Sequence, residues 1–281
     1  MIDYKKFTEK SIGFLAEYIK TNNLKSLVLG VSGGIDSTIT AIIASEACKK
    51  CEIPLIGRSL PSCSNSPEEI TTATLIGRSF CNDFKEVTIE RIYSAVANLL
   101  ELYEGKLSLL QLGNIKARLR MIYLYNLASM HGGCVLDTSN KTEYELGFWT
   151  IHGDVGDINC GLINLWKTEV YELANCLFMS IPTSEPNKLK AVEESINLIP
   201  TDGNGVTDNG DCDQFGLDNY EQIDDVLKTM YFEAGMDSSK YTRLIDLYNE
   251  QGVDKIMTLH QNSNFKRKHL PIYPDISYLS Q

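Results

Sequence analysis

A glycine-rich segment at residues 30–38, GVSGGIDST, has the residue types of a phosphate-binding turn. It follows the apolar run LVL at residues 27–29, so it lies where a strand would end and a helix would begin. Unpaired backbone N–H groups at a helix N-terminus bind anionic oxygens, and the hydroxyls of Ser32 and Ser37 would add donors. The alternative is a turn in which the glycines only permit the geometry. Two adjacent glycines with flanking serines and an aspartate favour phosphate binding.

The aspartate of this segment, Asp36, occupies the position at which a Walker A loop has its lysine. A bare carboxylate beside phosphates would repel them. Magnesium binds through one or two carboxylates together with substrate phosphates, so a Mg²⁺ ion between Asp36 and the phosphates resolves the conflict. We therefore expect Asp36 to be a metal ligand and the bound anion to be the pyrophosphate end of ATP.

Four further motifs accompany the loop, and they begin at residues 113, 138, 152 and 165: GNIKARLRM, TSNKTEYELG, HGDVGDIN and LWKTEVYELA. The SGGIDS segment itself resembles the loop of the N-type ATP pyrophosphatases, which split ATP between its α- and β-phosphates, and the four further motifs support a more specific resemblance. Within that superfamily, nearly the whole chain is similar to the NAD synthetases. The resemblance implies a ligase that amidates deamido-NAD with ammonia through an acyl-adenylate, using ATP and Mg²⁺ and giving NAD, AMP and pyrophosphate.

The same resemblance implies a set of site residues. ATP would be bound by Gly30, Val31, Ser32, Gly33, Gly34, Ile35, Asp36, Ser37, Thr138, Lys167 and Thr201. Magnesium would be bound by Asp36 and Glu143, and deamido-NAD by Arg118, Asp154, Asp157 and Lys266. Asp154 would orient ammonia and accept its proton, which is general-base work. Lys167 would neutralise the ATP phosphates, so these two residues are the expected catalytic ones.

Several of these residues have an ordinary structural interpretation as well. Asn140 and Glu143 have the spacing of a helix cap with its partner acid. Arg118 could be an exposed helix charge, the commonest position of arginine, and Lys167 could be a surface residue at a helix N-terminus. The motif beginning at His152 and ending near Cys160 contains possible zinc ligands, but their spacing matches no structural zinc pattern.

Composition and charge limit the function classes. The chain has 281 residues, 43% of them hydrophobic and 22% charged, which is typical of a globular protein. Its net charge of −11 argues against a nucleic-acid partner. No apolar run reaches membrane-spanning length and the N-terminus lacks a signal-peptide core, so we expect a cytoplasmic protein without a membrane partner. The eight scattered cysteines fit reduced packing thiols, and Cys48 and Cys51 would lie about 20 Å from the phosphate site at the far end of a helix.

Strands alternate with helices along the first half of the chain, which predicts an α/β fold with a doubly wound parallel sheet covered by helices on both faces. The resemblance makes it adenine nucleotide alpha-hydrolase-like. Strands are expected at residues 27–31, 53–58, 86–89 and 134–137, and helices from residue 35 and at 67–81, 91–102 and 110–130. We expect one domain over residues 1–281, with a lid loop at 200–216 and a C-terminal helical tail at 220–281 that contains three short helices.

The helix at residues 110–130 is apolar on several sides, which suits either a core helix or a helix shared with a second subunit. The resemblance implies a homodimer formed through such helices. The chain departs from the common family pattern at Asp137, Ile151, Asn164 and Phe265, and residues 184–199 have the character of an insertion. Competing hypotheses are another pyrophosphatase-loop ligase, a tRNA-modifying enzyme, or a non-catalytic nucleotide-binding relative.

Overall fold

The computed structural model contains a five-stranded parallel sheet with the strand order β3-β2-β1-β4-β5. It describes all residues except 1, 202, 204, 207–209, 233–236 and 269–281. The strands are β1 (Ser26–Gly30), β2 (Leu55–Ser59), β3 (Asp83–Glu86), β4 (Gly133–Asp137) and β5 (Ile158–Asn159). β1 lies in the middle, pairing with β2 on one side and with β4 on the other. The strand order reverses there, and ligands of such sheets bind beyond the carboxyl ends of the strands at this switch point.

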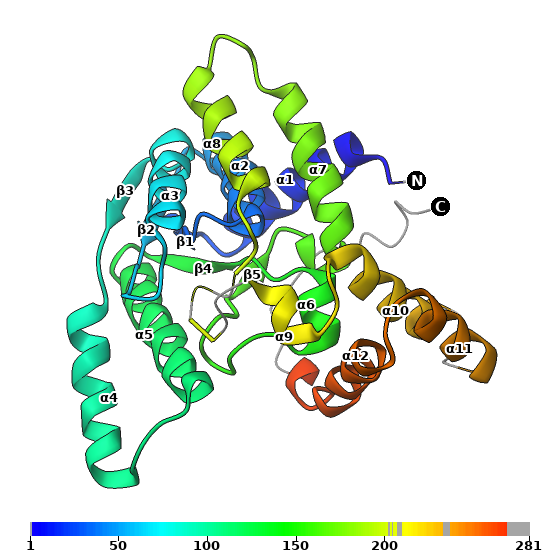
Figure 1. Cartoon of the computed structure of the whole chain (residues 1–281). Coiled ribbons are helices and arrows are strands. Elements are labelled where there is room, and N and C mark those ends of the chain that lie inside the picture. The colour runs from blue at the N-terminus through cyan, green and yellow to red at the C-terminus, as the bar shows by residue number, and fades with distance from the viewer. Residues whose placement is uncertain (1, 202, 204, 207–209, 233–236, 269–281) are drawn as a thin grey trace.

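Helices cover both faces of the sheet (Figure 1). Leu27 and Leu29 of β1 face one layer, whereas Val28 between them faces the other, because successive strand side chains alternate. The first layer consists of α1 (Tyr4–Thr21), α2 (Ile35–Cys51), α3 (Pro67–Phe80), α7 (Lys167–Ser180) and α8 (Pro186–Asn197). The second consists of α4 (Glu90–Glu104) and α5 (Leu109–Met130). The doubly wound fold predicted from the sequence is confirmed.

The predicted helix starts at Ile35 and Pro67 are confirmed, and a capping box between Ser66 and Glu69 fixes the second of them. The third strand begins three residues earlier than predicted, because its own residues are mostly polar and the apolar residues that indicate a strand follow it. The N–H groups of Val87 and Ile89 donate to the carbonyls of Ser59 and Pro61, so this segment stays beside the end of β2 before α4 begins. The helix α8 and the strand β5 were not predicted.

The three predicted C-terminal helices are present as α10 (Tyr220–Phe232), α11 (Ser238–Leu247) and α12 (Glu250–Asn262). They pack with α6 (Lys141–Leu146) around a separate hydrophobic cluster that includes Trp166 and Phe215. The expected lid loop at residues 200–216 lies partly outside the described residues. Its described end forms a short helix, α9 (Asp211–Phe215), rather than an irregular segment.

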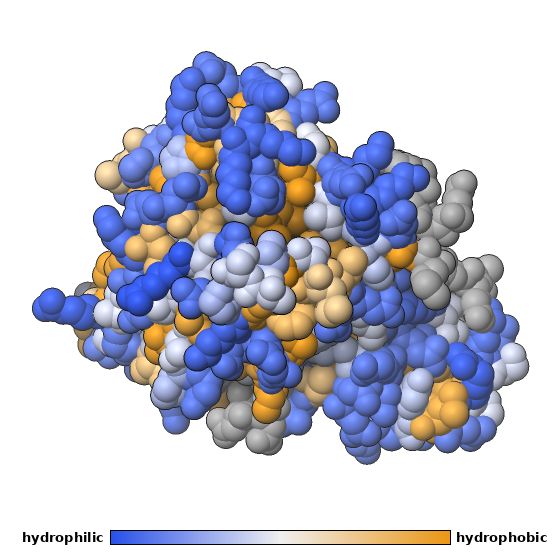
Figure 2. Space-filling view, turned by 90° about the horizontal axis from the view of Figure 1, so that it is seen from above, coloured by the Kyte–Doolittle hydropathy of each residue, from blue (hydrophilic) through white to orange (hydrophobic). Residues whose placement is uncertain are grey.

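The surface seen from above is mainly hydrophilic, with smaller hydrophobic patches between the polar side chains (Figure 2). Helix α5 is partly a core helix, because Ala117 and Leu124 are buried, and it also has the exposed apolar surface expected of a helix shared with a second subunit, because Ile122 is 66% exposed. α4 adds exposed apolar side chains, among them Leu102. Within the described part of the chain, no helix is long and apolar enough to cross a membrane.

Candidate active site

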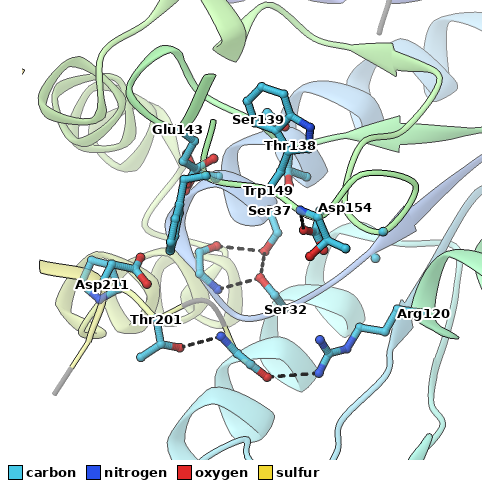
Figure 3. A pocket seen from close by; sticks show the side chains of 18 of the residues that line it. Ser32, Ser37, Arg120, Thr138, Ser139, Glu143, Trp149, Asp154, Thr201 and Asp211 are labelled. Atoms are coloured by element: carbon cyan, nitrogen blue, oxygen red, sulfur yellow. Dashed lines mark hydrogen bonds between the residues drawn. The ribbon is translucent and has the colours of Figure 1, made fainter. Parts of the chain in front are cut away.

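A cavity of about 600 Å³ opens beyond the carboxyl ends of the central strands. Its walls come from the glycine-rich turn, from α5, from the segment after β4 and from described residues between 198 and 215. Figure 3 shows Glu143 and Asp211 on one side of this cavity and Asp154 and Arg120 on the other. Predicted site residues that line it are Gly30, Val31, Ser32, Gly34, Ile35, Asp36, Ser37, Thr138, Glu143, Asp154, Lys167, Thr201 and Lys266.

The glycine-rich turn joins β1 to α2 and presents the helix N-terminus to the cavity. Gly33 has a φ of +98°, and a Cβ there would lie 2.6 Å from the backbone oxygen of Glu69, so only glycine fits. Gly34 caps α2 without a side-chain acceptor for its first amides. Ser32 Oγ donates to Ser37 Oγ at 3.1 Å, which places both hydroxyls beside those amides (Figure 3). The turn can therefore bind anionic oxygens through backbone and hydroxyl donors.

Lys167 connects the two predicted metal ligands at the floor of the cavity. Its Nζ lies 2.5 Å from Asp36 Oδ2 and 3.5 Å from Glu143 Oε1. Asn140 donates from Nδ2 to the other oxygen of Asp36 at 2.9 Å. Lys167 is only 3% exposed, so it is not a surface residue. The first turn of α2, the first turn of α6 and the start of α7 thus meet at one point.

Burial and neighbouring charges shift the pKa values of this group in opposite directions. Burial, together with the carboxylate of Asp36, raises the pKa of Glu143 to about 8. Burial alone would lower the pKa of Lys167, but the carboxylates of Asp36 and Glu143 raise it above the ordinary lysine value. Lys167 is therefore firmly cationic, and Glu143 retains affinity for a proton or another cation.

Glu143 completes a helix cap and also faces the cavity. Its backbone N–H donates to Asn140 Oδ1 at 3.0 Å, and its Oε2 accepts the Asn140 N–H at 3.3 Å, which completes a capping box. Its second carboxylate oxygen, Oε1, faces Lys167 and the cavity. The cap holds the side chain in one orientation and leaves an oxygen available for a ligand.

Asp36 and Glu143 fit a magnesium ion better than a zinc ion. Both offer carboxylate oxygens, which Mg²⁺ prefers, and it takes its remaining ligands from water and substrate phosphates. Among the described residues, no group of three or more His, Cys, Asp or Glu side chains is placed to hold a metal by itself. A metal bound here would need ligands from the nucleotide as well.

The opposite wall carries Asp154 on the loop that follows Trp149. Asp154 Oδ2 accepts the Thr150 N–H at 2.6 Å, and Thr150 Oγ1 donates to Asn114 Oδ1 at 2.7 Å. These bonds fix the loop against α5 and leave the carboxylate at the cavity wall. A carboxylate in this position can orient an ammonium ion and accept a proton.

Lys266 reaches the same wall from the C-terminal segment. Its Nζ donates to the carbonyls of Gly147 at 2.8 Å and Trp149 at 2.7 Å. Burial lowers the pKa of Lys266, although Asp154 nearby opposes this shift. The lysine thus fixes the Trp149 loop and places a positive charge near Asp154.

Two predicted substrate contacts, Arg118 and Asp157, do not line the cavity. Arg118 is exposed on α5, and its Nε donates to the carbonyl of Ile151 at 3.2 Å. Asp157 accepts the Val135 N–H at 2.8 Å and the Tyr125 hydroxyl at 2.9 Å, which ties its loop to β4 and α5. Within one chain, the side chains of Arg118 and Asp157 therefore lie apart from the predicted site residues that line the cavity.

Arg120 was missed, although it lies in the same motif as Arg118. Two residues on a helix are about 200° apart, so the two arginines point in opposite directions. Arg120 lines the cavity, donating from Nε to the Leu60 carbonyl at 3.0 Å and from Nη2 to the Gly203 carbonyl at 3.2 Å. One feature of the sequence could have indicated Arg120. It follows Gly113 by seven residues, about two helical turns, so both lie on the same side of α5, and Gly113 also lines the cavity.

Of the positions that depart from the family pattern, Asp137 has the clearest structural role. Its buried carboxylate accepts from Ser139 Oγ at 2.9 Å, Asn159 Nδ2 at 2.6 Å and the Gly156 N–H at 3.2 Å. These contacts join the ends of β4 and β5 next to Thr138. The CxxC cysteines are free thiols at the far end of α2, as expected.

A parallel α/β sheet with a phosphate-binding turn and an acidic site at its switch point defines a nucleotide-binding enzyme. The family model described as NAD synthase matches residues 7–270. The chain therefore belongs to the NAD synthase family, as its motifs had suggested.

Individual relatives agree with this assignment. The chain is 32% identical over 271 residues to the NH(3)-dependent NAD(+) synthetase of Pyrococcus furiosus, covering 96% of each. It is 34% identical over 228 residues to the enzyme of the same name from Finegoldia magna, covering 80% of this chain and 85% of that one. Among solved structures, the NMN synthetase of Francisella tularensis is similar, with a TM-score of 0.74 at 27% identity, covering 98% of this chain and all (100%) of that chain.

Proposed function

We propose that the chain is a ligase of NAD biosynthesis that amidates deamido-NAD with ammonia, converting ATP to AMP and pyrophosphate. The observation that carries this proposal is the meeting of Asp36, Glu143 and Lys167 under the phosphate-binding turn, with Asp154 across the same cavity. One side is suited to phosphate chemistry and the other to an ammonium ion. A non-catalytic relative would not need to retain both.

The first step is adenylylation of the nicotinate carboxylate. A carboxylate oxygen of deamido-NAD forms a bond to the α-phosphorus of ATP, and the bond from that phosphorus to the bridging oxygen of the β-phosphate breaks. Pyrophosphate leaves with its electron pair. The amides and hydroxyls of the turn, together with the Lys167 ammonium, stabilise the charge on the leaving group.

The second step is amide formation. Ammonia, oriented by Asp154, forms a bond to the acyl carbon, and the bond from that carbon to the AMP oxygen breaks. Asp154 accepts a proton from the attacking nitrogen, and AMP leaves. The catalysis rests mainly on positioning and on charge stabilisation.

Asp36 and Glu143 are the residues that would hold a magnesium ion, with the nucleotide phosphates supplying further ligands. A bound Mg²⁺ would neutralise charge on the phosphates. Lys167 already lies between these two carboxylates, so the protein itself supplies one positive charge at this position.

We also infer a homodimer formed through α4 and α5, acting in the cytoplasm. The exposed apolar side chains of these helices support the dimer, and Arg118 lies on the same helix. Eight free cysteines are compatible with a reducing compartment. Light scattering should give twice the 31.5 kDa chain mass. Ile122→Glu should yield monomers, whereas Met179→Glu, an exposed apolar residue on α7, should not.

The decisive assay combines the protein with ATP, Mg²⁺, deamido-NAD and ammonium and measures NAD, AMP and pyrophosphate. Omission of each component supplies the controls. Equal amounts of the three products support the proposal. Deamido-NAD labelled with ¹⁸O in its carboxylate should transfer one label to AMP, and unlabelled AMP would exclude the acyl-adenylate.

Nicotinate mononucleotide is a second candidate substrate, because the similar Francisella protein is an NMN synthetase. Its amidation would give NMN by the same two steps. The two substrates should be compared by kcat/KM in the same assay. A higher value for the mononucleotide would change the substrate assignment without changing the chemistry.

A further inference from the structure

Helix α7 begins at the catalytic lysine, and its own Glu169 accepts only the N–H of the N-cap residue Trp166, at 2.9 Å. Its N-cap residue is Trp166, whose side chain makes no capping hydrogen bond. The indole N–H can only donate a hydrogen bond, so the Trp166 side chain cannot accept one from the backbone N–H groups of the first helical turn. At any helix N-terminus the first backbone N–H groups have no partner within the helix. Burying such a group without a hydrogen-bond acceptor costs folding free energy.

Two residues from other helices supply the missing acceptors. Thr142 Oγ1 of α6 accepts the Lys167 N–H at 2.8 Å, and Asp224 Oδ2 of α10 accepts the Thr168 N–H at 2.9 Å. Thr142 in turn donates its hydroxyl proton to Asp224 Oδ1 at 2.5 Å. One carboxylate from the C-terminal helices thus satisfies the start of α7 both directly and through a bridging hydroxyl.

The position of this network in the sequence links it to the active site. Thr142 precedes Glu143, and Lys167 is the first residue of α7. The network therefore fixes the backbone of both residues whose side chains meet at the cavity floor. Asp224 and Thr142 are almost fully buried, so water does not compete for these hydrogen bonds.

We propose that Asp224 is a positioning residue for the adenylylation step, acting through Thr142 and the α7 N-terminus to hold Lys167 and Glu143 at their working separation. This inference rests on the proposed function and adds a residue to it. Asp224 itself does not line the cavity. Its effect on catalysis must pass through the two helix starts that it joins.

The substitution Asp224→Asn tests this directly, because it keeps the size of the side chain. An asparagine has one acceptor oxygen instead of two, so either Thr142 or the Thr168 N–H loses its partner. Displacement of a catalytic group by about 1 Å can reduce a rate about a hundredfold. We expect pyrophosphate release to slow by about tenfold to a hundredfold, with little change in the KM for ammonium, because Asp154 lies on a different loop.

Thr142→Val and the double variant reveal the route. Thr142→Val removes the bridging hydroxyl at equal size and should give a similar loss. If both residues act through one network, the double variant should be no more than about threefold slower than the slower single variant, because losses within a shared network are not additive. The matched control is Asp225→Asn on the same helix, whose carboxylate accepts from Arg243 and Tyr248 away from the site.

Thermal melts separate positioning from folding. A purely structural Asp224 would lower the melting temperature and the active fraction while leaving KM for ATP and kcat per folded molecule unchanged, and that result would overturn the proposal. Full additivity in the double variant would overturn it as well. If the unmodified protein makes no amide product from either nucleotide, the proposed function fails instead, so the two failures are distinguishable.

Discussion

Replacing Lys167 with methionine tests whether the ion pair at the cavity floor holds the site together. Lys167 lies 2.5 Å from Asp36, and both side chains are largely buried. Removing one partner of a buried ion pair costs about 3–5 kcal/mol, because the remaining charge is left uncompensated. Glu143 moderates this loss: its pKa of about 8 keeps it largely protonated at neutral pH, so the Asp36 carboxylate is the main charge left without compensation.

The expected decrease in unfolding free energy is therefore about 3 kcal/mol, at the lower end of the range for a broken buried pair. For a chain of this size it corresponds to a melting temperature lower by roughly 5 °C. Pyrophosphate release should fall by about 10²–10³-fold, as for the loss of one group that stabilises charge in the transition state. Calorimetry in metal-free buffer and a coupled pyrophosphate assay measure the two effects.

Lys188→Met is the matched control. Lys188 pairs with Glu185 at the same 2.5 Å distance, but the pair is partly exposed and lies within one turn of α8. Such pairs contribute about 0.3–0.5 kcal/mol. Equal losses in the two variants would refute the argument from burial, and unchanged pyrophosphate release in Lys167→Met would remove the lysine from the chemistry.

Three further outcomes are expected. Asp154→Asn should abolish NAD formation while ATP–pyrophosphate exchange persists, and loss of both would place Asp154 in the first step. Arg120→Met should raise the KM for ATP about tenfold or more, because the hydrogen bonds from the charged guanidinium to the Leu60 and Gly203 carbonyls are lost. An unchanged KM would show that these bonds do not shape the nucleotide site. Burial raises the pKa of the thiols of Cys48, Cys81, Cys134 and Cys160 to about 12, so these thiols stay protonated at pH 8. A disulfide reagent should therefore modify the exposed Cys63 first and should not modify these four thiols until the protein unfolds.

The glycine-rich turn could be predicted from the sequence because its geometry is local. Gly33 can adopt the positive φ of the turn, and Gly34 next to it caps α2, although the close approach of Glu69 to Gly33 could not be predicted. Glu143 was predictable for a similar reason, since its spacing from Asn140 sets the cap that orients it. In both cases the chemistry and the local structure depend on the same few residues.

The remaining site residues depend on packing between distant segments. Choosing between Arg118 and Arg120 requires the rotation of α5 about its axis, which an apolar pattern on several sides does not fix. Trp149 and Asp211 reach the cavity only after α6 and α9 have docked. Asp224 carried no signal at all, because its partners lie far away in the sequence.

The network at the start of α7 also determines when, during synthesis of the chain, the protein can become catalytically active. The β1–β2 pairing and the contacts of α1 with α2 join neighbouring segments and can form early. In contrast, Lys167 and Asp36 are 131 residues apart, and Thr142 and Asp224 are 82 apart. Closing such long loops is slow. A nascent chain that has not yet released α10 from the ribosome can therefore hold a sheet but not an organised nucleotide site, and activity should appear as one of the last events of folding.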